Sequence, residues 1–331
     1  MDGAALGRLT DVPFQPRSVR AEAPPLSFIL TTERCHLSCV MCHFNGPNTK
    51  RRGEVTIEPA LVRKTLEARP KGEKIWFVAT GDFFSDPNAL DYIRMARDLG
   101  LLPRVITHGQ HLVPTFIDEV LEAGVTEFLI SVDSIDATQY ARIRRGGKLE
   151  VILAACDYLR ARKQAYPRLV VGVTVICFPK SRHSKSEVTE FWKSKVDYVQ
   201  FVSEYHDVFR LRRLFFLPER RTDCHVGVIP LPSGQVAPCC AVVIYSHDHD
   251  VSWLPHLKDD TPEQAYQKLC DMYEDPTSPL SKLCATCDWW VQFHTDENGN
   301  TPVYQVVTFN DVTSENLSSG AAVPPTGSSA S

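Results

Sequence analysis

Short apolar runs alternate with helix-sized amphipathic segments from residue 25 to residue 205. The apolar runs have the length and the β-branched content of buried strands. The expected strands are residues 26–32, 74–80, 104–107, 127–132, 169–178 and 198–203. The helical patterns lie between them, at residues 59–68, 88–99, 113–123, 137–144, 149–162 and 186–195. Such alternation predicts parallel strands joined by right-handed helical crossovers.

This alternation predicts an α/β fold. We expect a partial (β/α)6 barrel, with an open doubly wound sheet as the alternative, and in both folds the loops after the strands carry the site. After residue 205 the alternation stops and cysteines become frequent, which predicts a small α+β cysteine-rich domain. The expected parts are an N-terminal extension at 1–24, the barrel at 25–205, a linker at 206–223, the cysteine-rich domain at 224–305 and a flexible tail at 306–331.

The charge balance argues against one class of partner. Lys and Arg total 36 while Asp and Glu total 40, so no basic excess is present to hold a phosphate backbone, and nucleic acid is not an expected partner. No apolar run approaches the roughly 20 residues that cross a bilayer, and the N-terminus lacks the apolar segment of a signal peptide.

Because the 11 cysteines are odd in number, we expect metal binding in a reducing cytoplasm rather than a disulfide framework.

Three cysteines, Cys35, Cys39 and Cys42, follow the first expected strand. Loops after parallel barrel strands carry active sites. Three thiolates leave one position of a tetrahedral metal, or one iron of a cubane cluster, open to a further ligand. The residues therefore predict a catalytic iron–sulfur cluster. The alternatives are a zinc site completed by His36 or His43, and a redox dithiol.

This Cys-x3-Cys-x2-Cys spacing resembles the cluster motif of the radical SAM superfamily, and the strand pattern extends the resemblance over residues 26 to about 205. The resemblance implies that Cys35, Cys39 and Cys42 hold a [4Fe–4S] cluster whose fourth iron binds S-adenosyl-L-methionine (SAM). It also implies that a one-electron reductant such as flavodoxin or ferredoxin drives cleavage of SAM to a 5′-deoxyadenosyl radical, which abstracts a substrate hydrogen atom. The protein then has to orient one substrate C–H bond toward the radical carbon and keep water out of the site.

Further residues match positions that bind SAM in this superfamily. Thr80, Gly81 and Asp82 end the second expected strand, where the family has a Gly-Gly-Glu that receives the methionine amino group. Ser131 ends the fourth expected strand and resembles a position near the ribose or methionine part of SAM. Arg144 is similar to the arginine that meets the SAM carboxylate, because a guanidinium fork suits a carboxylate. A solvated helix end is the alternative interpretation of Arg144.

A second set of cysteines lies in the C-terminal third. Cys224 and Cys239 flank an expected hairpin with a Pro-Ser-Gly turn, and Cys284 and Cys287 follow an expected helix at 262–273. This pattern resembles the auxiliary-cluster domains called twitch and SPASM, and the lack of a cysteine after Cys287 is similar to the shorter twitch type of 2-deoxy-scyllo-inosamine dehydrogenase-like enzymes. The resemblance implies that these four residues hold a second, auxiliary [4Fe–4S] cluster. A structural four-cysteine zinc knuckle is the alternative.

Other polar residues are candidates near the substrate. Cys240 has two interpretations: as a catalytic hydrogen-atom donor it would make the enzyme a redox-neutral epimerase, and as a buried thiol it would leave an auxiliary cluster to accept an electron in a dehydrogenase. His108 and Gln110 follow the third expected strand and are expected at the barrel mouth. His247 and His249 are expected in a solvated loop.

The sequence thus indicates a radical SAM oxidoreductase or epimerase. Its substrate is expected to be a polar small molecule, such as a sugar, aminocyclitol or aminoglycoside of natural-product biosynthesis. A radical SAM peptide maturase or peptide epimerase is the second hypothesis, and a non-catalytic binding protein stabilised by a cluster or by zinc is the third. No membrane partner is expected.

Overall fold

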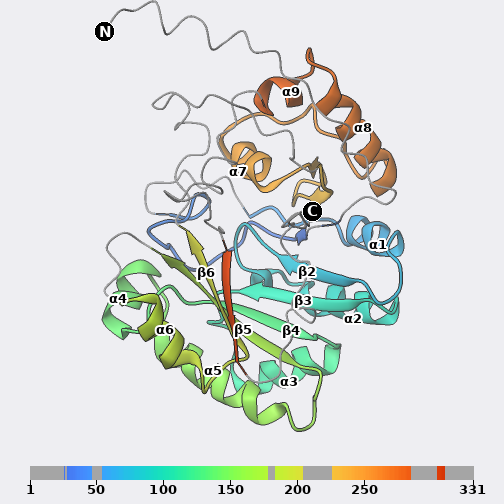
Figure 1. Ribbon diagram of the computed structural model, residues 1–331. Helices are drawn as coiled ribbons and strands as arrows, with labels where there is room; N and C mark the ends of the chain where they lie inside the picture. Colours follow the sequence, from blue (N-terminus) through green and yellow to red (C-terminus); the bar gives the residue numbers. More distant parts are fainter. Residues whose placement is uncertain are drawn as a thin grey trace, which may run out of the picture.

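The computed structural model describes residues 26, 28–46, 54–177, 183–203, 226–284 and 304–309. These residues form a curved sheet covered by helices, and a second group of helices gathers at one side of the molecule (Figure 1). Among the residues described, no helix is both long enough and apolar enough to cross a membrane.

The sheet has seven strands in the order β1-β2-β3-β4-β5-β6-β9, and the first six are parallel. The parallel strands are β1 (Ile29–Leu30), β2 (Lys74–Val78), β3 (Leu102–Thr107), β4 (Glu127–Ser131), β5 (Val170–Cys177) and β6 (Tyr198–Ser203). The α/β class is therefore confirmed. Each of the six strands lies beside its neighbour in sequence with no reversal of order, which is the arrangement of a partial barrel and excludes the doubly wound alternative.

Helices between the strands cover the outside of this sheet (Figure 1). They are α1 (Pro59–Glu67), α2 (Ala89–Asp98), α3 (Pro114–Ala123), α4 (Ala137–Ile143), α5 (Leu149–Arg162) and α6 (Lys185–Trp192), with a 3-10 turn η1 (Phe83–Ser85) after β2. Their ends follow local chemistry, because α1 and α3 begin with a proline and α6 begins with a capping box of Ser184 and Glu187.

The two faces of the sheet have different contents because successive strand residues point to opposite sides. Phe77 of β2 stacks on Phe83 and joins the main core under the helices. Trp76, beside it in sequence, lies in a separate small cluster on the inner face. The inner face also buries an ion pair between Arg104 Nε and Glu127 Oε2 at 2.9 Å. A buried pair of this kind is a fixed part of the barrel interior, because removing one partner would leave the other charge buried without a counter-ion.

The C-terminal third has a short hairpin followed by three helices. These are β7 (Ile229–Pro230), β8 (Val236–Ala237), α7 (Cys240–Asp248), α8 (Pro262–Glu274) and α9 (Pro279–Cys284). The hairpin and α8 lie where the sequence predicts them. This part packs against the barrel, since Lys64 of α1 donates to the Leu257 carbonyl at 2.7 Å and Leu26 pairs with Val228.

Two elements differ from the expectation. The prediction of a solvated loop around His247 is wrong. Residues Cys240–Asp248 form helix α7, and His247 is buried in this helix. The apolar run that begins this helix is rich in valine, so its strand-like composition is overridden by packing. Strand β9 (Tyr304–Thr308) was not expected, and it pairs antiparallel with β6. It spans residues 305 and 306, between which the predicted cysteine-rich domain ends and the predicted tail begins.

Candidate active site at the carboxyl end of the sheet

A cavity of about 270 Å³ opens where the parallel strands end. Its apolar wall includes Val78 of β2, Ile106 of β3 and Ile176 of β5. It is also lined by every residue that the sequence predicts for the SAM-binding cluster and for SAM, namely Cys35, Cys39, Cys42, Thr80, Gly81, Asp82, Ser131 and Arg144. The volume is several times the roughly 30 Å³ that a water molecule occupies, so the cavity has room for a larger group.

The loop that carries the three cysteines is held by backbone contacts. Ser38 N donates to the Arg145 carbonyl at 3.0 Å, and Val40 N donates to the Ile143 carbonyl at 2.9 Å. Cys42 N donates to the Cys39 carbonyl at 3.1 Å, which closes a turn between two of the cysteines. The loop is therefore docked on the end of α4, and its thiols are presented to the cavity by fixed backbone.

The end of β2 lies unusually close to the start of this loop. Asp82 N donates to the Arg34 carbonyl at 2.8 Å, and Gly81 N donates to the Thr32 carbonyl at 3.2 Å. A Cβ atom on Gly81 would stand only 2.0 Å from the Arg34 oxygen. Only glycine permits this approach of two backbones, which explains the residue type at position 81.

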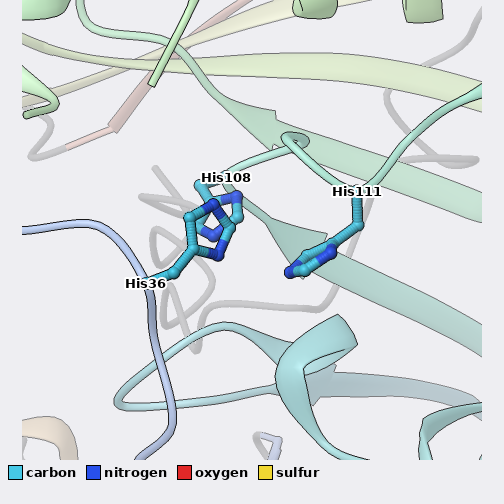
Figure 2. Close-up of side chains that lie close together, drawn as sticks. All are labelled: His36, His108 and His111. Carbon is cyan, nitrogen blue, oxygen red and sulfur yellow. The ribbon is translucent and has the colours of Figure 1, made fainter. Parts of the chain in front are cut away.

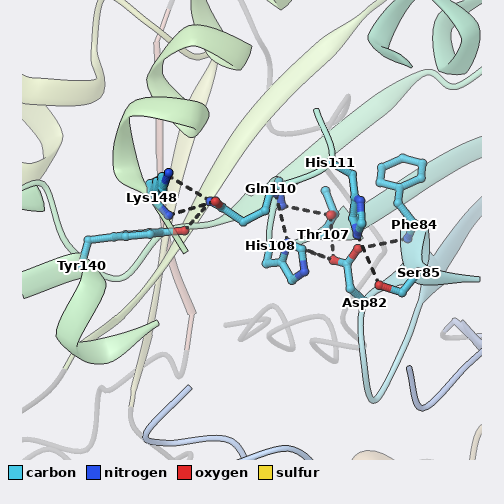
Figure 3. A network of polar contacts seen from close by, with 10 residues as sticks. Asp82, Phe84, Ser85, Thr107, His108, Gln110, His111, Tyr140 and Lys148 are labelled. Atoms are coloured by element: carbon cyan, nitrogen blue, oxygen red, sulfur yellow. Dashed lines mark hydrogen bonds and ion pairs between the residues drawn. The ribbon is translucent and has the colours of Figure 1, made fainter. Parts of the chain in front are cut away.

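Asp82 is a buried carboxylate that ties together two strand ends (Figure 3). Its Oδ1 accepts hydrogen bonds from Thr107 Oγ1 at 2.7 Å and from His108 N at 2.8 Å, and its Oδ2 accepts one from Phe84 N at 3.1 Å. Because these contacts occupy its oxygens, Asp82 acts here first as a residue that positions β2, η1 and the loop after β3. Its predicted contact with SAM stays a prediction.

Arg144 is buried, with 7% of its surface exposed, so the solvated helix end considered for it is wrong. Its Nη2 lies 2.7 Å from Asp133 Oδ2, and Asp133 Oδ1 in turn accepts from Ile176 N at 2.9 Å. Asp133 holds this position in the left-handed region, with φ at 63°. The Nε of Arg144 is buried and has no hydrogen-bond partner among the residues described, so one charged donor is left for a ligand in the cavity.

The three thiols fit an iron–sulfur cluster better than a single ion. Burial raises the pKa of Cys35 to about 12, with further rises from Asp82 and the other two thiols, and burial also raises the pKa of Cys39. Such thiols need a cationic centre to become thiolates. Within the described part of the chain, the three thiols do not form a group tight enough for one ion, whereas a multi-iron cluster spreads its ligands. Asn45 N also donates to Cys42 Sγ at 3.1 Å.

The second cysteine set is only partly described. Cys239 caps the start of α7, Cys240 is the first residue of that helix, and Cys284 is the last residue of α9. Cys224 and Cys287 lie outside the described residues, so the four-cysteine site stays a prediction. Cys240 is half-buried and is not among the residues that line the cavity.

The two candidates after β3 differ in what they can offer. His108 lines the cavity with 6% of its surface exposed, and burial lowers its pKa to about 4, so its ring is neutral at pH 7. Gln110 is already engaged, because its amide donates to Tyr140 Oη at 3.1 Å and exchanges hydrogen bonds with the Lys148 backbone (Figure 3). Gln110 therefore holds the loop in place, and its expected role at the substrate has no support in these contacts.

Sequence reasoning missed several residues around the cavity. Asp133 and Asn45 make contacts that no motif predicts. His36 was considered only as a zinc ligand beside the cysteines, and its position next to His108 and His111 was not predicted. The one signal for Asp133 was its position two residues after the end of β4, where a barrel places functional side chains. The histidines are brought together only by the meeting of two loops.

A thiol-bearing loop that faces a cavity at the mouth of a partial barrel is the arrangement of an enzyme whose metal centre keeps one position free. Residues 29–181 match the sequence model of the Radical SAM superfamily. This stretch, a little under half of the chain, is therefore similar to a radical SAM domain, the kind of domain that holds a [4Fe–4S] cluster and SAM.

Two curated relatives are GTP 3′,8-cyclases. That of Marinobacter nauticus is 25% identical over 173 residues, 52% of this chain and 52% of that protein. That of Listeria monocytogenes is 28% identical over 130 residues, 38% of each. The chain thus aligns with about half or less of the length of these relatives. Among solved structures, SuiB of Streptococcus suis bound to the precursor peptide SuiA has a TM-score of 0.56 at 12% identity, covering 80% of this chain and 70% of that one, which shows a shared fold.

Changing Gly81 to alanine tests the close approach of the two backbones. The new Cβ would overlap the Arg34 carbonyl, so the cysteine loop must shift, and we expect Gly81→Ala to lose most of the iron that the wild type takes up on anaerobic reconstitution. Gly72→Ala is the matched control. Gly72 has a positive φ and open space around it, so this change costs about 1–2 kcal/mol of stability but leaves the site intact. Wild-type iron content in Gly81→Ala would contradict the account.

Proposed function

We propose that this protein is a radical SAM enzyme that abstracts a hydrogen atom from a C–H bond of a polar small molecule. Cys35, Cys39 and Cys42 would hold the cluster, and when bound the cluster and SAM supply a 5′-deoxyadenosyl radical after one-electron reduction by a flavodoxin- or ferredoxin-like partner. The observation that carries the proposal is the gathering of these cysteines and all predicted SAM residues on one cavity. A reducing cytoplasm suits such a reaction.

The chain's own residues would bind SAM and shield it. Arg144 has a buried, unused Nε that fits a carboxylate, and its pairing with Asp133 fixes the guanidinium plane. Val78, Ile106 and Ile176 give an apolar wall that excludes water from the reacting atoms. Thr80 and Ser131 offer hydroxyl groups on the same cavity.

The proposed substrate class is carbohydrate-like: a sugar, an aminocyclitol or an aminoglycoside. The polar groups at the cavity, including His108, Thr107 and Ser131, suit a ligand with several hydroxyl or amino groups. The curated relatives are named for GTP, which contains a ribose, so a nucleotide belongs among the candidates. A peptide is the second candidate, because SuiB shares the fold and was solved with a precursor peptide.

The net reaction depends on the C-terminal third. A second, auxiliary [4Fe–4S] cluster on Cys224, Cys239, Cys284 and Cys287 would accept an electron and make the enzyme a dehydrogenase. Cys240 offers the other outcome. Burial raises the pKa of its thiol to about 12, so it keeps the hydrogen that an epimerase would donate to a substrate radical. Its absence from the cavity lining favours the dehydrogenase in the conformation described here.

Formation of 5′-deoxyadenosine tests the proposed chemistry. Reconstituted, reduced wild type should cleave SAM, and the Cys35/Cys39/Cys42→Ala variant should not. With candidate substrates deuterated at carbon, the true class transfers deuterium into 5′-deoxyadenosine, so sugars, aminoglycosides, GTP and peptides can be compared in one assay. Label from peptides alone would replace the small-molecule proposal. A cluster-loaded protein that never cleaves SAM would be the non-catalytic binding protein.

Arg144→Lys tests the proposed carboxylate contact. Lysine keeps a positive charge opposite Asp133 but loses the Nε donor, so we expect the affinity for SAM to fall about tenfold or more. The exposed neighbour provides the control, and Arg145→Lys should bind SAM as the wild type does. Equilibrium dialysis with reconstituted protein of equal iron content measures both. An unchanged dissociation constant in Arg144→Lys would remove this residue from the SAM site.

The donor role of Cys240 is tested in deuterated water, with the substrate that the deuterium-transfer assay identifies. An epimerase that uses Cys240 places one solvent deuterium on the product, and Cys240→Ala stops this incorporation while 5′-deoxyadenosine still forms. Cys270→Ala is the matched control, because Cys270 is a buried thiol within α8. Oxidised product without solvent deuterium would assign Cys240 to packing alone.

A further inference from the structure

Three histidines lie close together (Figure 2), and one of them, His108, lines the cavity. His36 comes from the cysteine loop, directly after Cys35, whereas His108 and His111 come from the loop after β3. One ring nitrogen from each lies within 4.8 Å of the others. The ring centroids are 4.7 Å apart for His36 and His108, 4.9 Å for His36 and His111, and 5.6 Å for His108 and His111.

Packing of aromatic rings alone does not account for this group. The Nε2 of His108 is buried and has no hydrogen-bond partner among the residues described. An unpaired buried polar atom is costly, which makes a ligand at this nitrogen favourable. The other two rings remain accessible to such a ligand, since His111 is half-buried with Nε2 at 3.3 Å from Ser85 Oγ, and His36 is exposed.

We propose that His36, His108 and His111 bind a divalent transition-metal ion, separate from the predicted iron–sulfur clusters. Three imidazoles suit Zn²⁺, Co²⁺ or Ni²⁺, whereas Mg²⁺ and Ca²⁺ select oxygen ligands. Three protein ligands leave a fourth position for water or for a substrate heteroatom, as in catalytic rather than structural zinc sites. The group is the one set of three or more such ligands close enough for a single ion within the described part of the chain.

Binding requires one proton to change place. His108 Nδ1 accepts a hydrogen bond from Gln110 N at 3.1 Å, so the neutral ring carries its proton on Nε2. When the metal takes the Nε2 lone pair, this proton moves to Nδ1 and the Gln110 contact is given up. Asp82 Oδ1 lies 3.6 Å from Nδ1 and can accept the relocated proton's hydrogen bond after a small shift. The result is the carboxylate–histidine–metal arrangement typical of metal sites, with no net release of protons.

The ion would join the two loops that border the cavity. His36 is adjacent to a predicted cluster cysteine, and His108 lines the cavity itself. A metal bond between them would fix the cysteine loop against the loop after β3, in addition to the backbone contacts of Asp82. The open fourth position would stand at the rim, where a heteroatom of a bound substrate can reach it.

Metal content after reconstitution tests this proposal. Iron and sulfide are first loaded anaerobically to occupy the cysteines, one equivalent of Zn²⁺ is added, and unbound metal is removed before elemental analysis. We expect about one zinc per chain in the wild type. The His36→Ala/His111→Ala variant should lose this zinc and keep its iron, and His249→Ala, at an exposed histidine on the end of α7, should retain both.

The ligands of the bound zinc distinguish histidine from cysteine ligation and do not depend on the variants. X-ray absorption at the zinc edge of the iron-loaded wild type should show nitrogen ligands at about 2.0–2.1 Å, whereas a thiolate ligand would lie at about 2.3 Å. Nitrogen ligands on one equivalent of zinc support the histidine site. Zinc retained in the double variant, sulfur among the zinc ligands, or no zinc bound by the wild type would each overturn the proposal.

Discussion

The carboxylate of Asp82 is the contact on which the arrangement of the site depends. It receives hydrogen bonds from β3, from the loop after β3 and from η1, while its own backbone N–H reaches the loop that carries the cysteines. One buried residue thus joins the ends of two strands to the loop before the cluster motif. Parallel strands bring their carboxyl ends to the same edge, but these hydrogen bonds decide how the loops at that edge face one another.

Much of the barrel follows from sequence alone, because its signals are local. Apolar β-branched runs, prolines at the starts of helices and glycines after their ends predict the six parallel strands and their helices within a few residues. Helix α7 and strand β9 were not predicted because both depend on contacts with distant parts of the chain. The valine-rich run in α7 is typical of a strand and becomes helical through packing. Strand β9 is stabilised by pairing with β6, a strand about 100 residues earlier.

The candidate site divides in a similar way. The three cysteines and Arg144 belong to contiguous motifs, so their residue types and spacing are informative by themselves. Asp133 and the three histidines are not contiguous. Their roles depend on a backbone turn in the left-handed region and on the approach of two loops, and neither has a signature in one sequence. Gln110 shows the converse, since its position at the mouth suggested a substrate contact while its hydrogen bonds hold the loop to Lys148 and Tyr140.

The central claim is that the cavity cysteines hold a [4Fe–4S] cluster. Iron and acid-labile sulfide per chain, measured after anaerobic reconstitution in the wild type and in the Cys35/Cys39/Cys42→Ala variant, test it most directly. The account predicts that the variant holds about four fewer irons and about four fewer sulfides than the wild type, whatever the second cysteine set binds. Equal iron and sulfide in the two proteins would contradict it.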